Sequence, residues 1–220
     1  MRAVAPQSGD HFVEVGPGEG ALTAPLVAAA GRVEAIEVDR DLAARLEKQF
    51  PSLTVHRADA LEFDFMRLPH GVRVIGNLPY NISTALLFHL ARAAERMRDL
   101  HFMLQLEVVE RMVAAPSTAA YGRLSVSLQA RFHMKKLFNV ARGAFRPPPK
   151  VESAVVRLEP LSEPLRLNDD LVRRAFSARR KTLRNALPEI DFAAAGIDPG
   201  LRAENLSAAD YARLSMNSIL

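Results

Sequence analysis

The first half of the sequence alternates short runs rich in β-branched residues with longer stretches of helical periodicity. This alternation is typical of an α/β fold, in which helices cover both faces of a parallel sheet. The predicted strands lie at 11–15, 32–38, 53–56, 72–75 and 100–106. The predicted helices lie at 22–28, 41–50, 83–94 and 107–115.

The pattern changes after residue 120. A helix is predicted at 123–132, and strands are predicted at 136–140 and 151–158, on either side of a rigid run that holds three consecutive prolines. Beyond Pro160 the strand signals disappear, and helices are predicted at 168–187 and 207–220. We therefore expect an α/β domain at 1–160 and a small all-helical domain at 161–220.

The charge of the chain is unevenly distributed. Residues 1–120 hold 12 Lys and Arg against 15 Asp and Glu, a balance of −3, whereas residues 121–220 hold 17 against 10, a balance of +7. A basic half favours a partner with a negative surface, with nucleic acid ahead of an anionic membrane, although such a half can also be a merely solvated surface.

The composition excludes several other classes of protein. The chain has no cysteine, so disulfides and Cys-ligated zinc are excluded, and its six histidines show no metal-ligand spacing. No apolar run approaches the roughly 18 residues of a membrane span, and the first residues lack the apolar core of a secretory signal. We expect a cytoplasmic monomer without a bound metal.

A glycine-rich turn follows the first predicted strand. Gly16, Gly18 and Gly20 lie where a strand gives way to a helix, and the absence of side chains there lets a ligand lie against the backbone. Their G-x-G-x-G spacing differs from the G-x-G-x-x-G of dinucleotide sites, which argues against a nicotinamide-dependent oxidoreductase. Plain turn glycines would give the same pattern.

Acidic residues end the next two predicted strands. Glu37 lies about 20 residues after the glycine turn, where a carboxylate can accept hydrogen bonds from both hydroxyls of a ribose. Asp59 ends the third strand and can accept from an adenine amine, while Ala60 can pack near the ring. A nucleoside site without pyrophosphate indicates S-adenosylmethionine as the cofactor.

The fourth strand ends at Gly76 and runs into Asn77-Leu78-Pro79-Tyr80. These four residues offer a side-chain amide, backbone carbonyls outside regular structure and an aromatic face. They are suited to hold a flat base that bears an exocyclic amine. A plain turn, with Tyr80 in the core, is the alternative interpretation.

Six segments together resemble one known family. They are EVGPGEGALT (14–23), NLPYNIS (77–83), YGRLSV (121–126), FRPPPKVESAV (145–155), RRKTLRN (179–185) and ENLS (204–207). In this order they closely resemble the KsgA (RsmA) family of ribosomal RNA adenine dimethyltransferases. The resemblance implies a class I (Rossmann-like) methyltransferase domain and a small helical domain, and it implies dimethylation of two adjacent adenines near the 3′ end of small-subunit ribosomal RNA.

The resemblance also assigns roles to residues of this sequence. Asn77, which also borders the cofactor, and the Leu78 carbonyl would accept the two hydrogens of the target amine, and Pro79 would complete the turn. Tyr80 would stack on the base, and Phe145 would close its other face after the base leaves its stack. The alternative for Phe145 is core packing.

Six cations crowd one region of the second domain and form a candidate RNA-binding surface. Because six residues at helical spacing cannot share one face, some of them are expected to be ordinary surface charges. They are Arg173, Arg174, Arg179, Arg180, Lys181 and Arg184.

Family members carry a Gly-Gln-x-Phe-Leu motif ahead of the first strand, in a segment that helps to cover the cofactor. The motif does not occur in these 220 residues, and its absence bears on cofactor affinity and activity. This absence motivates one alternative to the small-subunit enzyme, a ribosome-assembly or RNA-binding factor with impaired catalysis. A macrolide-resistance-type methyltransferase of large-subunit RNA, a relative with the same core, is a second alternative.

Overall fold

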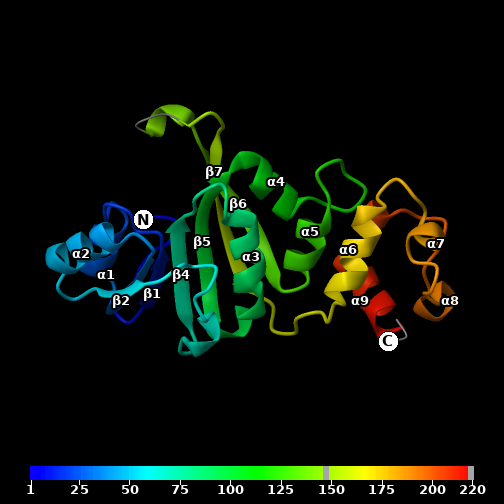
Figure 1. Ribbon diagram of the computed structural model, residues 1–220, viewed down its shortest axis with the longest axis horizontal. Coiled ribbons are helices and arrows are strands. Elements are labelled where there is room, and N and C mark those ends of the chain that lie inside the picture. The colour runs from blue at the N-terminus through cyan, green and yellow to red at the C-terminus, as the bar shows by residue number, and fades with distance from the viewer. Residues whose placement is uncertain (146–148, 218–220) are drawn as a thin grey trace. The chain divides into compact units, whose positions relative to one another are not determined.

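The structure is a computed structural model that describes residues 1–145 and 149–217 and divides into two compact units (Figure 1). The sheet unit comprises Met1–Val109 and Lys135–Pro160, and the helical unit comprises Glu110–Met134 and the chain from Leu161 onward. The chain passes from the sheet unit to the helical unit after Pro160. Residues 110–134, which were predicted to lie in the domain 1–160, belong to the helical unit.

The described strands form a seven-stranded mixed sheet in the order β3-β2-β1-β4-β5-β7-β6. Parallel pairing joins β3 to β2, β2 to β1, β1 to β4 and β4 to β5, which is the predicted parallel sheet, while β7 runs antiparallel to β5. The strands are β1 (His11–Val15), β2 (Arg32–Glu37), β3 (Thr54–Arg57), β4 (Val72–Asn77), β5 (Met97–Gln105), β6 (Phe132–Val140) and β7 (Ser153–Pro160).

An α-helix follows each of the first five strands except β3, which a 3₁₀ turn connects to β4, and α-helices dominate the chain beyond Pro160. They are α1 (Thr23–Ala29), α2 (Arg40–Gln49), α3 (Ser83–Arg92), α4 (Leu106–Val113), α5 (Arg123–Gln129), α6 (Asp169–Ser177), α7 (Leu183–Ala186), α8 (Phe192–Ala195) and α9 (Ala208–Met216). Short 3₁₀ turns occupy Phe65–Arg67, Ala94–Arg96, Arg142–Ala144 and Ala203–Asn205.

Polar side chains fix where several helices begin. The Asp39 carboxylate accepts hydrogen bonds from two backbone amides in the first turn of α2, at 2.8 and 3.0 Å. Asn168 caps α6 in the same way, and Ser207 caps α9 through the Asp210 amide. Each cap satisfies amides that have no partner within the helix. Pro25 is the third residue of α1, in the first turn, where proline is tolerated.

Two predicted helices end earlier than expected. The helix predicted at 123–132 stops at Gln129, because Phe132 already begins β6. The helix predicted at 168–187 is interrupted between α6 and α7, where Thr182 forms a β-bridge with Arg202. Long-range backbone pairing outweighs the local helical periodicity at this position. In the last predicted helix, residues 218–220 lie outside the described part of the chain.

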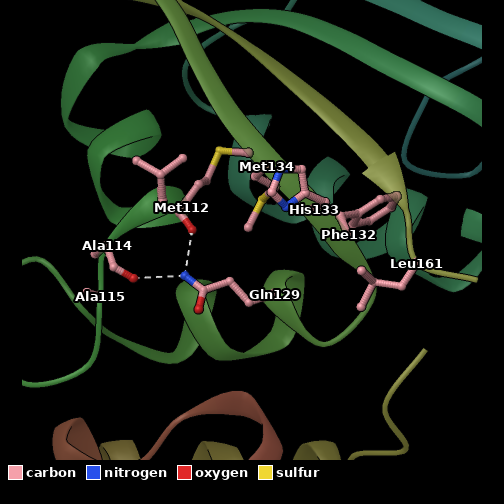
Figure 2. A pocket seen from close by; sticks show the side chains of 9 residues that line it. Met112, Ala114, Ala115, Gln129, Phe132, His133, Met134 and Leu161 are labelled. Atoms are coloured by element: carbon pink, nitrogen blue, oxygen red, sulfur yellow. Dashed lines mark hydrogen bonds between the residues drawn. The ribbon is translucent and has the colours of Figure 1, made fainter. Parts of the chain in front are cut away.

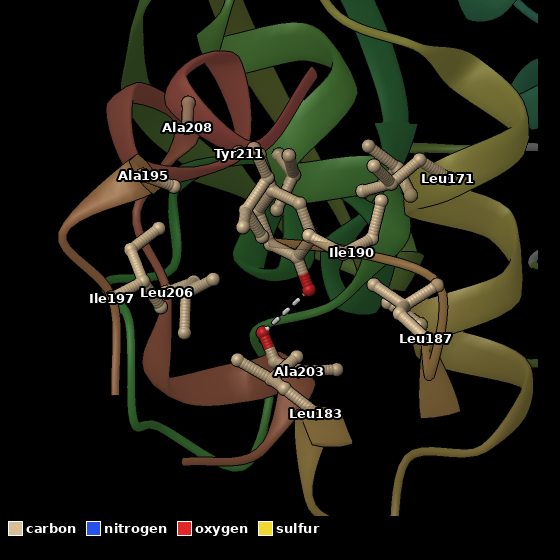
Figure 3. Close-up of a cluster of buried hydrophobic side chains, with 14 of the residues drawn as sticks. Leu171, Leu183, Leu187, Ile190, Ala195, Ile197, Ala203, Leu206, Ala208 and Tyr211 are labelled. Carbon is tan, nitrogen blue, oxygen red and sulfur yellow. Dashed lines mark hydrogen bonds between the residues drawn. The ribbon is translucent and has the colours of Figure 1, made fainter. Parts of the chain in front are cut away.

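The helical unit has its own apolar core (Figure 3). Tyr211 is fully buried in this core and donates a hydrogen bond from its hydroxyl to the Ala203 carbonyl at 2.9 Å. Tyr121, Val126 and Ala130 are buried in the same cluster. Their burial is the physical reason why residues 110–134 join the helical unit, although no signal local to the segment indicates it.

The amino ends of β1, β4 and β5 in the sheet unit are joined by buried charges. Arg73 is 4% exposed and bonds Asp10 at 2.7 Å and Asp99 at 2.9 and 3.0 Å. It also donates to the Val4 carbonyl at 2.7 Å. Burial tends to raise the pKa of Asp99, but His101 and Arg73 outweigh it and lower the pKa to about 2. Every charge here has a partner within the protein, as buried ions require.

Candidate functional site

The candidate site lies at the carboxyl edge of four adjacent parallel strands, β3, β2, β1 and β4. Val15 pairs with Ile36 across β1 and β2, so Gly16 and Glu37 follow at the same level. Glu37 pairs with Arg57 of β3, two residues before Asp59, and Asn77 is the last residue of β4. Strand ends of an open α/β sheet meet at one edge, which is where such folds bind ligands. The structure thus brings together the predicted residues at these strand ends.

The glycine turn after β1 is held in a conformation that suits glycine. Gly16, Gly18 and Gly20 all have positive φ, at 67°, 57° and 86°, a region that other residues rarely adopt. A Cβ at Gly16 or Gly18 would meet no protein atom within 4 Å, whereas a Cβ at Gly20 would lie 2.9 Å from the Phe50 ring. The first two glycines therefore border open space, and the third allows close packing against the ring.

Glu37 joins the glycine turn to the end of β2. Its Oε2 accepts from the Gly18 amide at 3.3 Å and its Oε1 accepts from the Asp39 amide at 3.0 Å, and the residue is 6% exposed. A carboxylate can accept about four hydrogen bonds, so these two contacts orient the group and leave capacity for a ligand. The next residue, Val38, is 68% exposed. This uncovered apolar side chain beside the acid was not identified from the sequence.

Asp59 and Ala60 follow β3. The Asp59 side chain is exposed and accepts from the Leu61 amide at 2.8 Å, while its carbonyl accepts from Glu62 and Phe63. Asp59 thus shapes a turn and keeps one carboxylate oxygen without a protein partner in the described chain. Ala60 is 8% exposed.

β4 approaches β1 so closely that glycine is required near its end. A Cβ at Gly76 would lie 2.6 Å from the Val15 carbonyl oxygen, closer than real Cβ contacts come. The strand continues through Gly76 to Asn77, whose side chain is exposed, two residues beyond the predicted strand end at Ile75. The close approach places Asn77 next to the glycine turn of β1.

The residues after Asn77 are fixed by two contacts with neighbouring strands. Leu78 is 1% exposed and its amide donates to the Met103 carbonyl of β5 at 3.2 Å. The Tyr80 hydroxyl and Ser153 Oγ, at the start of β7, are 2.9 Å apart. The Pro79 carbonyl accepts from Ile82, which closes a turn. The motif is therefore a rigid turn, and Tyr80 is only partly buried.

A buried acid beneath the glycine turn was also missed from the sequence. Glu14 is 1% exposed and accepts a hydrogen bond from Thr23 Oγ1 at 2.6 Å, which links β1 to the first residue of α1. Burial raises the pKa of Glu14 to about 7; the Thr23 bond opposes this rise, and the nearby Glu37 charge adds to it. The available signal was the position of Glu14 between two valines in a strand of a parallel sheet, because such strands are buried on both faces.

Phe145 belongs to the sheet unit and follows the 3₁₀ turn Arg142–Ala144. It is partly buried, and in the described part of the chain its ring makes no contact with the ring of Tyr80. Three residues of the rigid proline run, 146–148, lie outside the described residues. The role of Phe145 at the base stays a prediction.

The six cations predicted to bind RNA lie in the helical unit, on α6, on α7 and in the segment between them. Arg173 pairs with Asp170 at 2.5 Å, Arg174 with Glu189 at 2.8 Å, and Arg179 with Glu204. The other three are exposed, and none has an acidic side chain within 4 Å among the residues described. They are Arg180, Lys181 and Arg184.

Each of the two units contains a hollow. One of about 210 Å³ in the sheet unit is bordered by Gly18, Glu19 and one face of α2. The other, of about 360 Å³ in the helical unit, is shown in Figure 2. There the Gln129 side-chain nitrogen donates to the Met112 and Ala114 carbonyls at 3.0 and 2.8 Å. None of the predicted site residues lines this second hollow.

The described residues contain no group of three or more acids and histidines arranged to hold a metal ion. His11 and His56 instead bond one carboxylate, that of Glu34, at 2.7 and 2.5 Å. In the described chain, no helix is long and apolar enough to cross a membrane.

The chemistry of the strand-end residues fits S-adenosylmethionine. Glu37 offers acceptor capacity beside a glycine turn with open space above it, and Val38 offers an apolar surface. Asn77, at the end of β4, adds an exposed side-chain amide on the strand next to β1 and its glycine turn. Acceptors for ribose hydroxyls and an apolar contact for a base are what a nucleoside needs.

Comparisons with known proteins agree with this geometry. The ribosomal RNA small subunit methyltransferase A of Thiobacillus denitrificans is 57% identical over 96% of this chain and 88% of its own length. The crystal structure of a dimethyladenosine transferase from Plasmodium falciparum matches with a TM-score of 0.82 and 27% identity, over 97% of this chain and 91% of that one.

The crystal structure of the 23S rRNA methyltransferase ErmE matches with a TM-score of 0.72 and 25% identity, over 99% of this chain and 94% of that one. The family model described as ribosomal RNA adenine dimethylase matches residues 1–218. The chain belongs to the ribosomal RNA adenine dimethylase family.

Proposed function

We propose that this chain is an S-adenosylmethionine-dependent methyltransferase that dimethylates the N6 amines of two adjacent adenines near the 3′ end of small-subunit ribosomal RNA, as a step of subunit maturation. The observation that carries the proposal is the placement of Asn77-Leu78-Pro79-Tyr80 beside a nucleoside-type site, on adjacent strands of one sheet edge. The 57% identity to a small-subunit methyltransferase supports the choice of substrate.

In this proposal the cofactor lies across the strand ends. When bound, S-adenosylmethionine supplies an electrophilic methyl group. Glu37 accepts from the ribose hydroxyls, Val38 and Ala60 contact the adenine ring, and Asp59 accepts from the adenine amine. Gly16 and Gly18 keep the backbone open towards the ligand because they carry no side chains.

The target amine is activated by positioning. An adenine N6 amine is a poor nucleophile because its lone pair is delocalised into the ring. The Asn77 side-chain oxygen and the Leu78 carbonyl accept its two hydrogens and turn the lone pair towards the methyl group. The hydrogen bond from the Leu78 amide to the Met103 carbonyl holds the Leu78 residue, and so its carbonyl, in place. Preorganised acceptors of this kind accelerate a reaction without a strong base.

Aromatic stacking holds the flipped base. Tyr80 stacks on one face, and its hydroxyl contact with Ser153 fixes the ring at 2.9 Å from β7. Phe145 closes the opposite face once the RNA is bound. Stacking on an aromatic ring compensates for the unstacking of the base from the RNA.

RNA is positioned partly by the helical unit. Arg180, Lys181 and Arg184 are exposed and have no acidic partner among the described residues, so their charge is available to phosphates. Arg173, Arg174 and Arg179 are compensated by acids and contribute less. We further propose that the chain acts in the cytoplasm and as a monomer; sedimentation in the absence of the subunit tests the monomeric state.

The experiment is the transfer of labelled methyl groups from S-adenosylmethionine to unmodified small subunits. Label at two adjacent adenines is expected, and an unmethylated subunit would contradict the proposal. Naked large-subunit RNA is the comparison arm, because ErmE, a 23S rRNA methyltransferase, has a similar structure. Label in that arm alone would favour the large-subunit alternative. Binding of the subunit without cofactor binding would favour an assembly factor.

A further inference from the structure

The segment between Arg131 and Val151 holds six cations and no acidic residue. These cations are Arg131, Lys135, Lys136, Arg142, Arg146 and Lys150. Four of them lie in the described part of the sheet unit, where they are exposed and have no acidic side chain within 4 Å. Together with Phe138 these four form a surface that we call the β6 strip: Lys135, Lys136, Phe138, Arg142 and Lys150.

The β6 strip lies on an edge of the sheet. β6 is the last strand in the sheet order, so one side of it has no neighbouring strand in the described chain. The turn after β6 projects beyond β7 (Figure 1). An edge strand presents side chains on both faces and a row of free backbone groups, so a long ligand can lie along it.

An exposed aromatic ring lies among the lysines. Phe138 is 49% exposed and is two residues from Lys136, so both side chains lie on the same face of the strand. An apolar ring between cations is unfavourable in water but suits single-stranded nucleic acid, where bases stack on rings and phosphates meet lysines.

The β6 strip also leads to the proposed catalytic turn. The Arg142 guanidinium donates to the Lys150 carbonyl at 3.1 Å, which brings the two ends of the β6–β7 connection together. Lys150 is three residues before Ser153, so it lies within about 11 Å of that residue along the chain. Ser153 in turn contacts the Tyr80 hydroxyl at 2.9 Å.

We propose that the β6 strip binds the phosphate backbone of single-stranded RNA and guides the strand towards Tyr80. The inference rests on the proposed function, since it takes the RNA to be the substrate strand. It assigns RNA contacts to the sheet unit, in addition to those of the helical unit. Lys136, on the face that carries Phe138, and Lys135, on the opposite face of the edge strand, contact phosphates. Phe138 stacks on a base, and Arg142 with Lys150 holds the strand near the catalytic turn.

Two different roles for the β6 strip would give different results. Lysines on an edge strand can prevent pairing with other chains, in which case their loss would cause aggregation without changing RNA affinity. An anionic membrane is the second partner suited to a basic surface. Neither of these roles involves Phe138 in RNA binding.

The test is the affinity of the full chain for a short single-stranded RNA and for unmodified small subunits, measured over a range of salt concentrations. The Lys135→Gln/Lys136→Gln variant is compared with a Lys48→Gln/Arg67→Gln control, which removes two exposed charges elsewhere in the sheet unit. Each lost phosphate contact lowers the slope of log K against log salt by about 0.7 for single strands. We expect a slope about 1.4 smaller and an affinity about 25-fold lower at 0.1 M salt.

Two more variants separate the contribution of the lysine charges from that of the Phe138 ring. Lys135→Arg/Lys136→Arg is expected to keep the affinity, and Phe138→Leu is expected to lower it by about fivefold or more, because one stacked base is lost. Circular dichroism and gel filtration check that the exposed substitutions leave the fold and the monomer unchanged. A soluble, monomeric double variant that binds RNA like the control would overturn the inference.

Vesicles with anionic lipid form a further arm. Binding to these vesicles that depends on the two lysines, together with unchanged RNA affinity, would also overturn the inference. The outcome is independent of catalysis. A loss of RNA affinity in a chain that transfers no methyl group would support the β6 strip while the proposed function failed. Methyl transfer by the native chain, together with unchanged RNA affinity in the double lysine variant, would support the proposed function and overturn the β6 strip.

Discussion

The amino and carboxyl edges of the sheet, where the parallel strands begin and end, use polar and charged residues in opposite ways. At the amino edge, Arg73, Asp10 and Asp99 are buried and satisfy one another through short hydrogen bonds. At the carboxyl edge, Glu37 and Asn77 lie at strand ends beside glycines that border open space, and their remaining acceptors face no protein partner in the described chain. One edge is complete without a ligand, and the other has capacity to bind one.

This difference predicts that substitutions at the two edges change different quantities. A residue in a satisfied buried network contributes to stability, so its loss should be seen in unfolding. A residue with unused hydrogen-bonding capacity at an exposed strand end contributes to binding or catalysis, so its loss should leave the fold intact.

The largest expected effect is on stability at the amino edge. Arg73→Met leaves Asp10 and Asp99 buried without their shared partner, and we expect a loss of about 3–5 kcal/mol in the free energy of unfolding. Urea unfolding measures it. Arg98→Gln is the matched control, because Arg98 pairs with the same Asp10 from an exposed position and its loss should cost less than about 1 kcal/mol. Equal effects of the two variants would contradict the comparison.

Catalysis at the carboxyl edge should depend on Asn77 without a change in stability. Asn77→Ala removes an acceptor for the target amine, and we expect the rate of methyl transfer to fall by about 10²–10³, or roughly 2.7–4 kcal/mol. The Asn77 side chain is exposed, so the unfolding midpoint should stay the same. Single-turnover transfer and thermal unfolding are measured together. A variant that loses stability but keeps its rate would place Asn77 with the structural residues.

Glu14 shows that the carboxyl edge is stabilised less well than the amino edge. Its folded pKa of about 7 exceeds the ordinary 4.5, because burial disfavours the charged form. As pH rises from 4.5 to 7, the Glu14 carboxyl loses its proton in the unfolded chain but keeps it in the folded chain. The free energy of unfolding therefore falls over this pH window. Glu14→Gln should therefore be more stable than the wild type at pH 8, by up to about 3 kcal/mol.

Below about pH 4.5 both states keep the proton, and the stability difference between Glu14→Gln and the wild type should shrink. Chemical unfolding at pH 4 and pH 8 measures this change. A stability difference that is the same at both pH values would show that Glu14 titrates normally. Thr23→Val is a useful companion, since it removes the hydrogen bond that lowers the pKa of Glu14.

The smallest of these effects concerns cofactor affinity. Glu37→Gln keeps the size of the side chain but removes its charge, and hydrogen bonds to a charged group contribute about 1.5–3 kcal/mol. We expect S-adenosylmethionine to bind about 10- to 150-fold more weakly, measured by calorimetry. Glu47→Gln is the control, because Glu47 is an exposed acid of α2 whose partner is Arg57. Equal affinities of the two variants would remove Glu37 from the cofactor site.

Much of the sheet unit could be predicted from the sequence because its signals are local. The strand ends carry the glycine turn, Glu37, Asp59 and Asn77, and parallel strands place such ends at one edge. The pairing of Arg73 with Asp99 could not be predicted, because the two residues are far apart in the chain and meet only through the register of β4 and β5.

Long-range packing is the physical reason for the remaining differences. The helix predicted at 168–187 has continuous periodicity, yet it is interrupted after Ser177, and Thr182 in the interruption pairs with Arg202. Residues 110–134 were predicted to belong to the α/β domain, but Tyr121 and Val126 are buried in the helical core. Arg174 pairs with Glu189 and Arg179 pairs with Glu204. A count of charges along the sequence could not predict these two ion pairs.

The most direct test of the carboxyl edge as the catalytic edge is labelled methyl transfer by this chain to unmodified small subunits, with Asn77→Ala and Arg98→Gln measured alongside. We predict label at two adjacent adenines for the native chain and for Arg98→Gln, and at least a hundredfold slower transfer for Asn77→Ala. Transfer by Asn77→Ala at the native rate would contradict the claim that the carboxyl edge of β4 is the catalytic edge.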